Sequence, residues 1–294
     1  MSVRITCLYE NTPGEFKSLT ARHGLSLLIE TGTSRILMDT GQSEELIGNA
    51  QALGIDLGTV DFCVISHGHY DHTGGLEAFA AVNRAAPIYL REGAQKPHYS
   101  VKPSYGGIRY IGMSKQAREL KNLVFVGEDR AVSEEAELMG DLGGCYGMPR
   151  SNRYLKMLWR EDGFSGQEES ETEGKELPLV SDDFRHEQCL VLHTEGKSYL
   201  FSGCAHSGLR NILERYRGKY GAYPDWCLSG FHLAKEGDYT EEEMTEIRAD
   251  ARFLAGLPTE FVTMHCTGIP AYEEMKAVMG DRLRYMHCGD ILSI

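Results

Sequence analysis

Residues 66–76, with the sequence SHGHYDHTGGL, constrain this chain more than any other segment. They follow the apolar run DFCVIS, which is typical of a buried strand. In an extended segment, residues two apart point to the same side, so His67 and His69 can reach one cation together. The chain then turns, and Asp71 and His72 can reach a second point nearby. Two glycines after the cluster permit close backbone packing at the start of the next helix.

The residue types in this segment are those of a metal site. Imidazole combined with carboxylate suits zinc, manganese or iron. The alternative is a surface turn that happens to be polar. Three histidines and an aspartate within six positions, directly after a buried strand, argue against that alternative. The sequence therefore predicts a transition-metal site, with Asp71 also a candidate catalytic group.

Four ligands cannot fill two catalytic metal sites, so later segments must supply others. Three histidines each follow an apolar run: His206 in YLFSGCAHSGL, His232 in CLSGFHL and His265 in FVTMHCTGIP. Strand ends collect functional groups in α/β architectures, because the loops there converge on one rim. We predict that His206 and His265 are ligands, and that His232 contacts substrate or donates a proton.

Two further residues near these segments have two interpretations each. Cys204, two positions before His206, is either a thiolate ligand or a small buried apolar residue. Asp39, in the segment ILMDTG, either accepts the second N–H of a ligand histidine or stabilises a turn.

The remaining histidines show no ligand pattern. His186 ends an acidic stretch and is either a substrate contact or a loop residue, and we favour the loop. We interpret the others as structural: His23, His98, His193 and His287.

The hydrophobic pattern predicts alternating strands and helices throughout the 294 residues. We expect one α/β domain over residues 1–294, with helices covering the outer faces of sheets. Residues 72–84 and 240–257 are predicted helices, the second with a Thr240 cap followed by acidic residues. The acidic, Gly-rich stretch at about 160–186 is predicted to be a loop or insertion, and 94–113 is also loop-like.

The composition argues against several classes of binding partner. A formal net charge of −13 makes a nucleic-acid partner unfavourable, although a locally basic pocket can hold a small phosphorylated substrate. No apolar run approaches the length of a membrane span or a signal peptide, so we expect no membrane partner and a cytoplasmic location. The eight cysteines form no C-x-x-C pair and are expected to be mostly buried free thiols. A homo-oligomer is compatible with all of this.

The motif HxHxDH at 67–72, followed by TGG, resembles that of the metallo-β-lactamase superfamily. The upstream MDTG and the late HCTG are similar to other motifs of that superfamily, and the resemblance spans nearly the whole chain. It implies a four-layer αββα sandwich with two divalent transition metal ions at one edge, zinc favoured and manganese or iron as alternatives. One metal would be held by His67, His69 and His206, and the other by Asp71, His72 and His265.

Within the superfamily, the segments HEQ, GCAHSGLRNI, GFHL and HCTG look most like the 7,8-dihydropterin-6-methyl-4-(β-D-ribofuranosyl)aminobenzene-5'-phosphate synthase-like branch. The chain departs from many hydrolases of the fold at Cys204, where those carry an aspartate that bridges the metals. The G-H-T-x-G ligand motif is also absent before QCLVLHT.

Three functions follow as hypotheses. The first is a dinuclear metal-dependent enzyme on a small, phosphate-bearing substrate, which under the branch resemblance joins a dihydropterin diphosphate to an aminobenzene ribosyl phosphate. The second is a general metal-dependent hydrolase of phosphodiesters or other esters. The third is a non-catalytic protein that holds a metal or senses a ligand.

Overall fold

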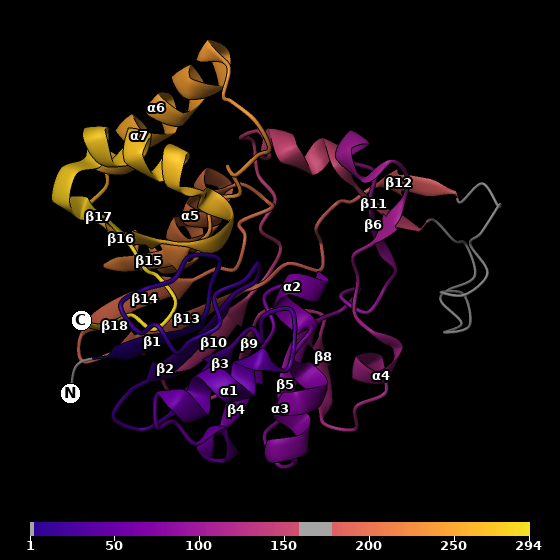
Figure 1. Ribbon diagram of the computed structural model, residues 1–294. Helices are drawn as coiled ribbons and strands as arrows, with labels where there is room; N and C mark the ends of the chain where they lie inside the picture. The colour runs from indigo at the N-terminus through magenta and orange to yellow at the C-terminus, as the bar shows by residue number, and fades with distance from the viewer. Residues whose placement is uncertain (1–2, 159–177) are drawn as a thin grey trace.

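The computed structural model describes residues 3–158 and 178–294 of the chain (Figure 1). Within these residues the backbone forms two seven-stranded sheets and a smaller four-stranded sheet. No helix in these two ranges is long and apolar enough to cross a membrane.

The first large sheet has the strand order β18-β1-β2-β3-β4-β5-β8. Its strands are β1 (Arg4–Tyr9), β2 (Ser26–Glu30), β3 (Arg35–Met38), β4 (Phe62–Val64), β5 (Ile88–Arg91), β8 (Leu123–Val126) and β18 (Ile291–Ser293). The pairs β18-β1, β1-β2 and β2-β3 are antiparallel, whereas β3, β4, β5 and β8 run parallel. The carboxyl ends of β3 and β4 therefore meet at one edge of the sheet.

The second large sheet has the order β17-β16-β15-β14-β13-β10-β9. Its strands are β9 (Arg130–Ala131), β10 (Ala136–Met139), β13 (Cys189–Thr194), β14 (Lys197–Phe201), β15 (Trp226–Ser229), β16 (Glu260–Thr263) and β17 (Leu283–Tyr285). Strands β14 to β17 are parallel. The loops after β14, β15 and β16 consequently leave the sheet at the same edge.

Helices cover the outer face of each large sheet, as Figure 1 shows. The first sheet carries α1 (Glu45–Ala52), α3 (Leu76–Val82) and α4 (Lys115–Arg118), and the second carries α5 (Leu209–Tyr220), α6 (Glu241–Ala255) and α7 (Ile269–Met279). The short α2 (Tyr70–Thr73) lies within the HxHxDH segment. Five 3-10 turns complete these ranges: η1 (Leu57–Thr59), η2 (Pro103–Tyr105), η3 (Arg150–Tyr154), η4 (His265–Thr267) and η5 (Gly280–Arg282).

Successive side chains of each strand point to opposite faces of the sheet, so each large sheet packs against the other sheet on one face and against helices on the other. In β2, Leu27 packs between the two sheets, whereas Leu28 packs under α1 and α3. In β13, Leu190 faces the first sheet and Val191 faces α5 and α6. The protein is therefore built as helix, sheet, sheet, helix, which confirms the αββα sandwich implied by the sequence resemblance.

The capping of α6 follows the sequence prediction. The Thr240 side chain accepts from the backbone N–H of Glu243, and the Glu243 carboxylate accepts from the backbone N–H of Thr240. The helix predicted over 72–84, however, is two helices in the structure, α2 and α3, separated by Gly74 and Gly75. Their backbones press against residues 40–43, so the break allows the histidine cluster to lie close to the β3 end.

The small sheet has the order β12-β11-β6-β7 and lies beside the sandwich (Figure 1). Its strands are β6 (His98–Ser100), β7 (Arg109–Tyr110), β11 (Leu155–Leu158) and β12 (Leu179–Ser181). The loop-like prediction for 94–113 was therefore incomplete, because β6 pairs with β11, which lies far away in the sequence and leaves no local signal. Residues 160–177 of the acidic stretch at about 160–186, predicted as a loop or insertion, lie outside the described residues, whereas 179–181 within it form β12.

Gly74 provides a test of the close packing between the two glycines that separate α2 from α3 and residues 40–43. A Cβ at Gly74 would lie 2.1 Å from the carbonyl oxygen of Gln42, a backbone atom that cannot rotate away. We expect Gly74→Ala to lower the free energy of unfolding by about 1–3 kcal/mol, as overpacking does. Gly48 in α1 has open space around it, and Gly48→Ala should instead raise that free energy by about 0.5–1 kcal/mol. Chemical denaturation measures both, and equal effects would contradict the packing argument.

Candidate metal centre

The side chains predicted as ligands come together where the two large sheets meet. His67 and His69 follow β4, and His206 and His265 follow β14 and β16. All of them are buried, as are Asp71, His72 and Cys204. The elements thus bring together donors from positions up to about 200 residues apart, because parallel strands share one carboxyl edge.

His67, His69 and His206 form the first group. The Nε2 atoms of His67 and His206 lie 3.2 Å apart. The His69 ring lies edge-on to both, with centroid distances of 4.6 Å to His67 and 4.9 Å to His206.

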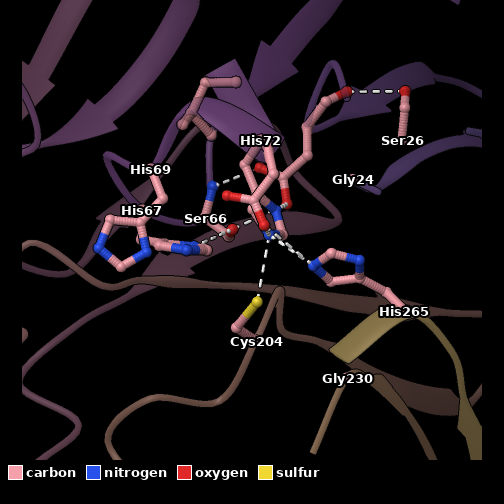
Figure 2. Close-up of polar contacts among 12 residues, drawn as sticks. Gly24, Ser26, Ser66, His67, His69, His72, Cys204, Gly230 and His265 are labelled. Atoms are coloured by element: carbon pink, nitrogen blue, oxygen red, sulfur yellow. Dashed lines mark hydrogen bonds and ion pairs between the residues drawn. The ribbon is translucent and has the colours of Figure 1, made fainter. Parts of the chain in front are cut away.

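Asp71, His72, His265 and Cys204 form the second group. The Nε2 atoms of His72 and His265 are 3.2 Å apart, and Asp71 Oδ2 lies 3.3 Å from His265 Nε2 and 3.8 Å from His72 Nε2. Cys204 Sγ lies 3.1 Å from His72 Nε2. Figure 2 shows His72 directed toward both Cys204 and His265.

These separations fit the spacing of ligands around a tetrahedral metal. Zinc–nitrogen bonds of about 2.0–2.1 Å place two ligand nitrogens about 3.3 Å apart. The two pairs of Nε2 atoms match that spacing. Sulfur, with a zinc bond of about 2.3 Å, would lie about 3.6 Å from a ligand nitrogen, so Cys204 fits less closely.

Each Nε2 in the two pairs is available because Nδ1 of the same ring is occupied. Asp39 accepts from Nδ1–H of His72 at 2.6 Å, and the Ser66 hydroxyl, which itself donates to Asp39, accepts from His67 at 2.9 Å. An asparagine side-chain oxygen accepts from each of the other two rings, Asn152 from His206 at 3.1 Å and Asn11 from His265 at 2.8 Å. Such partners fix the tautomer and the ring orientation of a metal ligand.

Two buried carboxylates hold the backbone of the turns that carry the candidate ligands His206 and His265. Glu187 accepts from the backbone N–H groups of His206 and Ser207, both at 2.7 Å. Glu10 accepts from the N–H of His265 at 2.6 Å and from the Tyr285 hydroxyl at 2.8 Å. Buried carboxylates are costly unless they are hydrogen-bonded, so these contacts fix both turns firmly.

Backbone strain gathers at the same place. Asp39, Ala205, His232 and His265 have φ values of 60°, 54°, 50° and 52°. Non-glycine residues rarely adopt this left-handed region, and such residues concentrate at functional sites. The turns that carry the candidate ligands therefore fix side-chain positions at a cost in backbone strain.

The pKa shifts favour cation binding. Burial lowers the pKa of His67 and of His206 well below the ordinary value, and neighbouring imidazoles lower it further. Both rings are therefore neutral at pH 7, which is the form that binds metal. Burial also lowers the pKa of His72, but Asp39 and Asp71 outweigh it and raise that pKa to about 9. A cation at Nε2 would replace the proton that these carboxylates attract.

Cys204 and His232 lie beside the two groups. Burial raises the pKa of the Cys204 thiol well above its ordinary value, so without a cation it stays protonated. The His232 ring lies 4.1 Å from the His206 ring, and neither of its nitrogens has a hydrogen-bond partner in the described residues. Both nitrogens thus remain available for a ligand or substrate.

The structure also adds residues that the sequence pattern did not single out. His23, interpreted as structural, has its Nε2 3.0 Å from Asp71 Oδ2. His98 and His186, interpreted as structural and as a loop residue, lie together with Asp182 beside His69. His193 and His287 lie in neither group. A polar residue that acts through one hydrogen bond to a distant histidine leaves no periodic signal in a sequence.

A sequence profile of the metallo-β-lactamase superfamily matches residues 19–241, and the chain therefore belongs to that superfamily. Over 292 residues it is 29% identical to an uncharacterized protein of Methanocaldococcus jannaschii, covering 99% of this chain and 100% of the relative. It is 24% identical to the 7,8-dihydropterin-6-methyl-4-(β-D-ribofuranosyl)-aminobenzene-5'-phosphate synthase of the same organism, covering 99% and 96%. A solved structure of a metal-dependent hydrolase of the β-lactamase superfamily superposes with a TM-score of 0.76 at 26% identity, covering 99% of both chains.

Asp39 offers a test of the arrangement around the ligands. Asp39→Asn keeps the shape but weakens the hydrogen bond to His72, and we expect metal affinity to fall about 10- to 100-fold. Asp61 is the matched control, since this exposed carboxylate accepts from the backbone N–H of Arg35. Competition with a chromogenic chelator measures affinity, and an equal loss in Asp61→Asn would contradict the orienting role.

Proposed function

We propose that this protein is a dinuclear metal-dependent enzyme that acts on a small, phosphate-bearing substrate. The observation that carries the proposal is the pair of donor groups, spaced as ligands of one tetrahedral metal each and positioned next to a cavity. In this proposal His67, His69 and His206 hold one metal, and Asp71, His72 and His265 the other.

The cavity has a volume of about 740 Å³ and is lined by residues of η3 and α6. His232, whose ring lies 4.1 Å from that of His206, also lines it, and Phe231, Tyr146, Met148 and Tyr154 supply apolar wall. A volume of this size accommodates a metabolite with a ring system, which is the class of ligand such cavities usually hold.

The charges in the cavity favour an anion. Arg150, Arg210 and Lys235 line it but pair with carboxylates of α6. Lys102 and Arg153 also line it, and no ion pair between described residues involves either of them. Two cations without a carboxylate partner among the described residues, in a chain of net charge −13, are therefore placed to bind phosphate oxygens.

Divalent cations in the centre would act as Lewis acids toward phosphate oxygens or water. His232 lies beside His206 and lines the cavity, and because its ring has no hydrogen-bond partner among the described residues it can hold or donate a proton to a bound substrate. Lys102 and Arg153 would orient the distal phosphate. The neutral first-group histidines keep that side of the centre free of competing protons.

The synthase relative suggests a specific reaction. Joining a dihydropterin diphosphate to an aminobenzene ribosyl phosphate forms one bond to the pterin methylene group and releases diphosphate. Such a leaving group carries several negative charges, which suits an anion-binding cavity beside a metal pair. The similarity to that relative covers nearly the whole of both chains, which supports the assignment.

Hydrolysis is the second candidate, because the superposed solved structure is that of a metal-dependent hydrolase. The two functions differ in the acceptor, which is an arylamine in one and water in the other. Metal-loaded protein supplied with both pterin and aryl substrates should release diphosphate only when both are present. Turnover of simple phosphodiesters at comparable kcat/KM would instead favour the hydrolase.

Arg153 tests the substrate class. We expect Arg153→Ala to raise KM for a phosphate-bearing substrate about tenfold with little change in kcat, because the guanidinium binds ground state and transition state alike. Arg84→Ala removes an exposed arginine that does not line the cavity and should leave KM unchanged. Steady-state kinetics distinguishes them, and a loss of kcat without a change in KM would contradict the phosphate-binding role.

A further inference from the structure

A cluster of buried donors lies next to the two groups of the metal centre. We call His98, Asp182 and His186 the outer cluster. Together with His69 they place one donor atom each within 4.8 Å of one another, and all four side chains are buried. His98 begins β6 and Asp182 follows β12, so the small sheet beside the sandwich brings them to His69.

Hydrogen bonds assign the protons of the outer cluster. His186 Nδ1 accepts from the Gly68 N–H at 3.2 Å, so its proton is on Nε2 and points to Asp182 Oδ2 at 3.2 Å. His98 donates from Nδ1 to the same oxygen at 2.9 Å. The other oxygen, Oδ1, accepts from the Phe184 N–H at 2.9 Å. Asp182 is thus held in place from three sides.

This arrangement leaves the negative charge of the Asp182 carboxylate without a cationic partner among the described residues. Asp182 is 4% exposed, and its ion-pair partners among the described residues are histidines only, at 2.9, 3.2 and 3.9 Å. Burial lowers the pKa of His186 and Asp182 raises it by more, but the hydrogen bond that Nδ1 accepts from the Gly68 N–H requires a ring with a single proton, on Nε2. A buried carboxylate without a cationic partner is costly. Nε2 of His69 and Nε2 of His98 are also buried and have no hydrogen-bond partner in the described residues.

We propose that Asp182 Oδ2, His98 Nδ1 and His69 Nε2 form a third divalent-cation site, with His186 holding Asp182 in position. The site lies beside the dinuclear centre and shares His69 with it. Three ligands of nitrogen and oxygen suit a transition metal such as zinc, with a fourth position left open.

The distances between donor atoms in the proposed third site are similar to those within the second group of the centre. Ligand atoms around a tetrahedral metal lie about 3.3 Å apart. Asp182 Oδ2 is 2.9 Å from His98 Nδ1 and 3.9 Å from His69 Nε2. Asp71 Oδ2 in the second group is 3.3 and 3.8 Å from its two histidine nitrogens. The hydrogen bond from His186 leaves Asp182 free to bind a cation as well, since ligating carboxylates commonly accept such a bond.

Binding at the third site requires the movement of two protons. The proton on His98 Nδ1 must leave, and the ring then carries its proton on Nε2. If His69 binds a metal of the centre through its other nitrogen, it must release its remaining proton to solvent, because an imidazole can serve two cations only as an anion. The third cation should therefore bind more weakly than the first two.

A cobalt titration tests the site without any substrate. Protein stripped of metal by a chelator is titrated with Co²⁺, and bound metal is counted by elemental analysis after gel filtration. We expect three equivalents per chain in the native protein, the third the weakest. Asp182→Asn and His98→Phe, which keep the side-chain volume, should each bind two equivalents and keep the visible spectrum of those two.

Control variants separate this proposal from the proposed function. His193→Phe removes an exposed histidine of β13 and should still bind three equivalents. Asp71→Asn should lose an equivalent from the centre and keep the one at Asp182. Saturation of the native protein at two equivalents would overturn the third site, and that count requires no variant to fold. Persistence of the third equivalent in both Asp182→Asn and His98→Phe would show adventitious binding and overturn it too. Loss of one of the two tight equivalents in Asp182→Asn would make Asp182 a positioning residue of His69 and would also refute it.

Discussion

Asp39 connects the first sheet to both donor groups of the candidate metal centre through a single buried carboxylate. One oxygen accepts from the backbone N–H of Ser66, and the other accepts from the Ser66 hydroxyl and from His72 Nδ1–H. Ser66 in turn accepts from His67. The end of β3 thereby sets the orientation of one histidine in each donor group. Because the carboxylate is fully buried, none of these contacts can be exchanged for water at low cost.

The sandwich explains why such a carboxylate can be placed at all. Asp39 has a φ of 60°, a conformation that a free chain would rarely adopt. The strand on one side and the glycines at 74 and 75 on the other force the turn into position. Ala205 and His265, in the turns that follow β14 and β16, also have positive φ values. The stability of the layered core thus offsets the cost of these strained conformations. The side chains are therefore held in place before any cation binds.

Much of this could be predicted from the sequence, and the limits have physical causes. The HxHxDH segment has ligand spacing within one short stretch, and the later histidines each follow an apolar strand, so their gathering at one edge could be anticipated. The helix break at Gly74 was missed, because it depends on the packing of Gly74 and Gly75 against residues 40–43, which lie far away in the sequence. Asn152 and Asn11 were missed because their contact to a histidine is a single hydrogen bond across the fold. His98 was missed because its neighbours Asp182 and His186 lie more than 80 residues away and meet it only through pairing of the small sheet.

The shared position of His69 makes the centre and the outer cluster interdependent. Its ring lies edge-on to those of His67, His206 and His98, and a neutral imidazole can offer only one nitrogen at a time to a metal. Any change that attracts the ring toward Asp182 therefore alters the donor strength available to the first group. Asp182 is fixed by the small sheet, and Lys102, near η2 in the same region of the chain, lines the cavity. A substrate bound against that wall would contact the same region that carries Asp182 and His98. Under these proposals, metal binding and substrate binding would be linked through the small sheet, because Lys102 lies two residues after the end of β6, the strand that begins with His98.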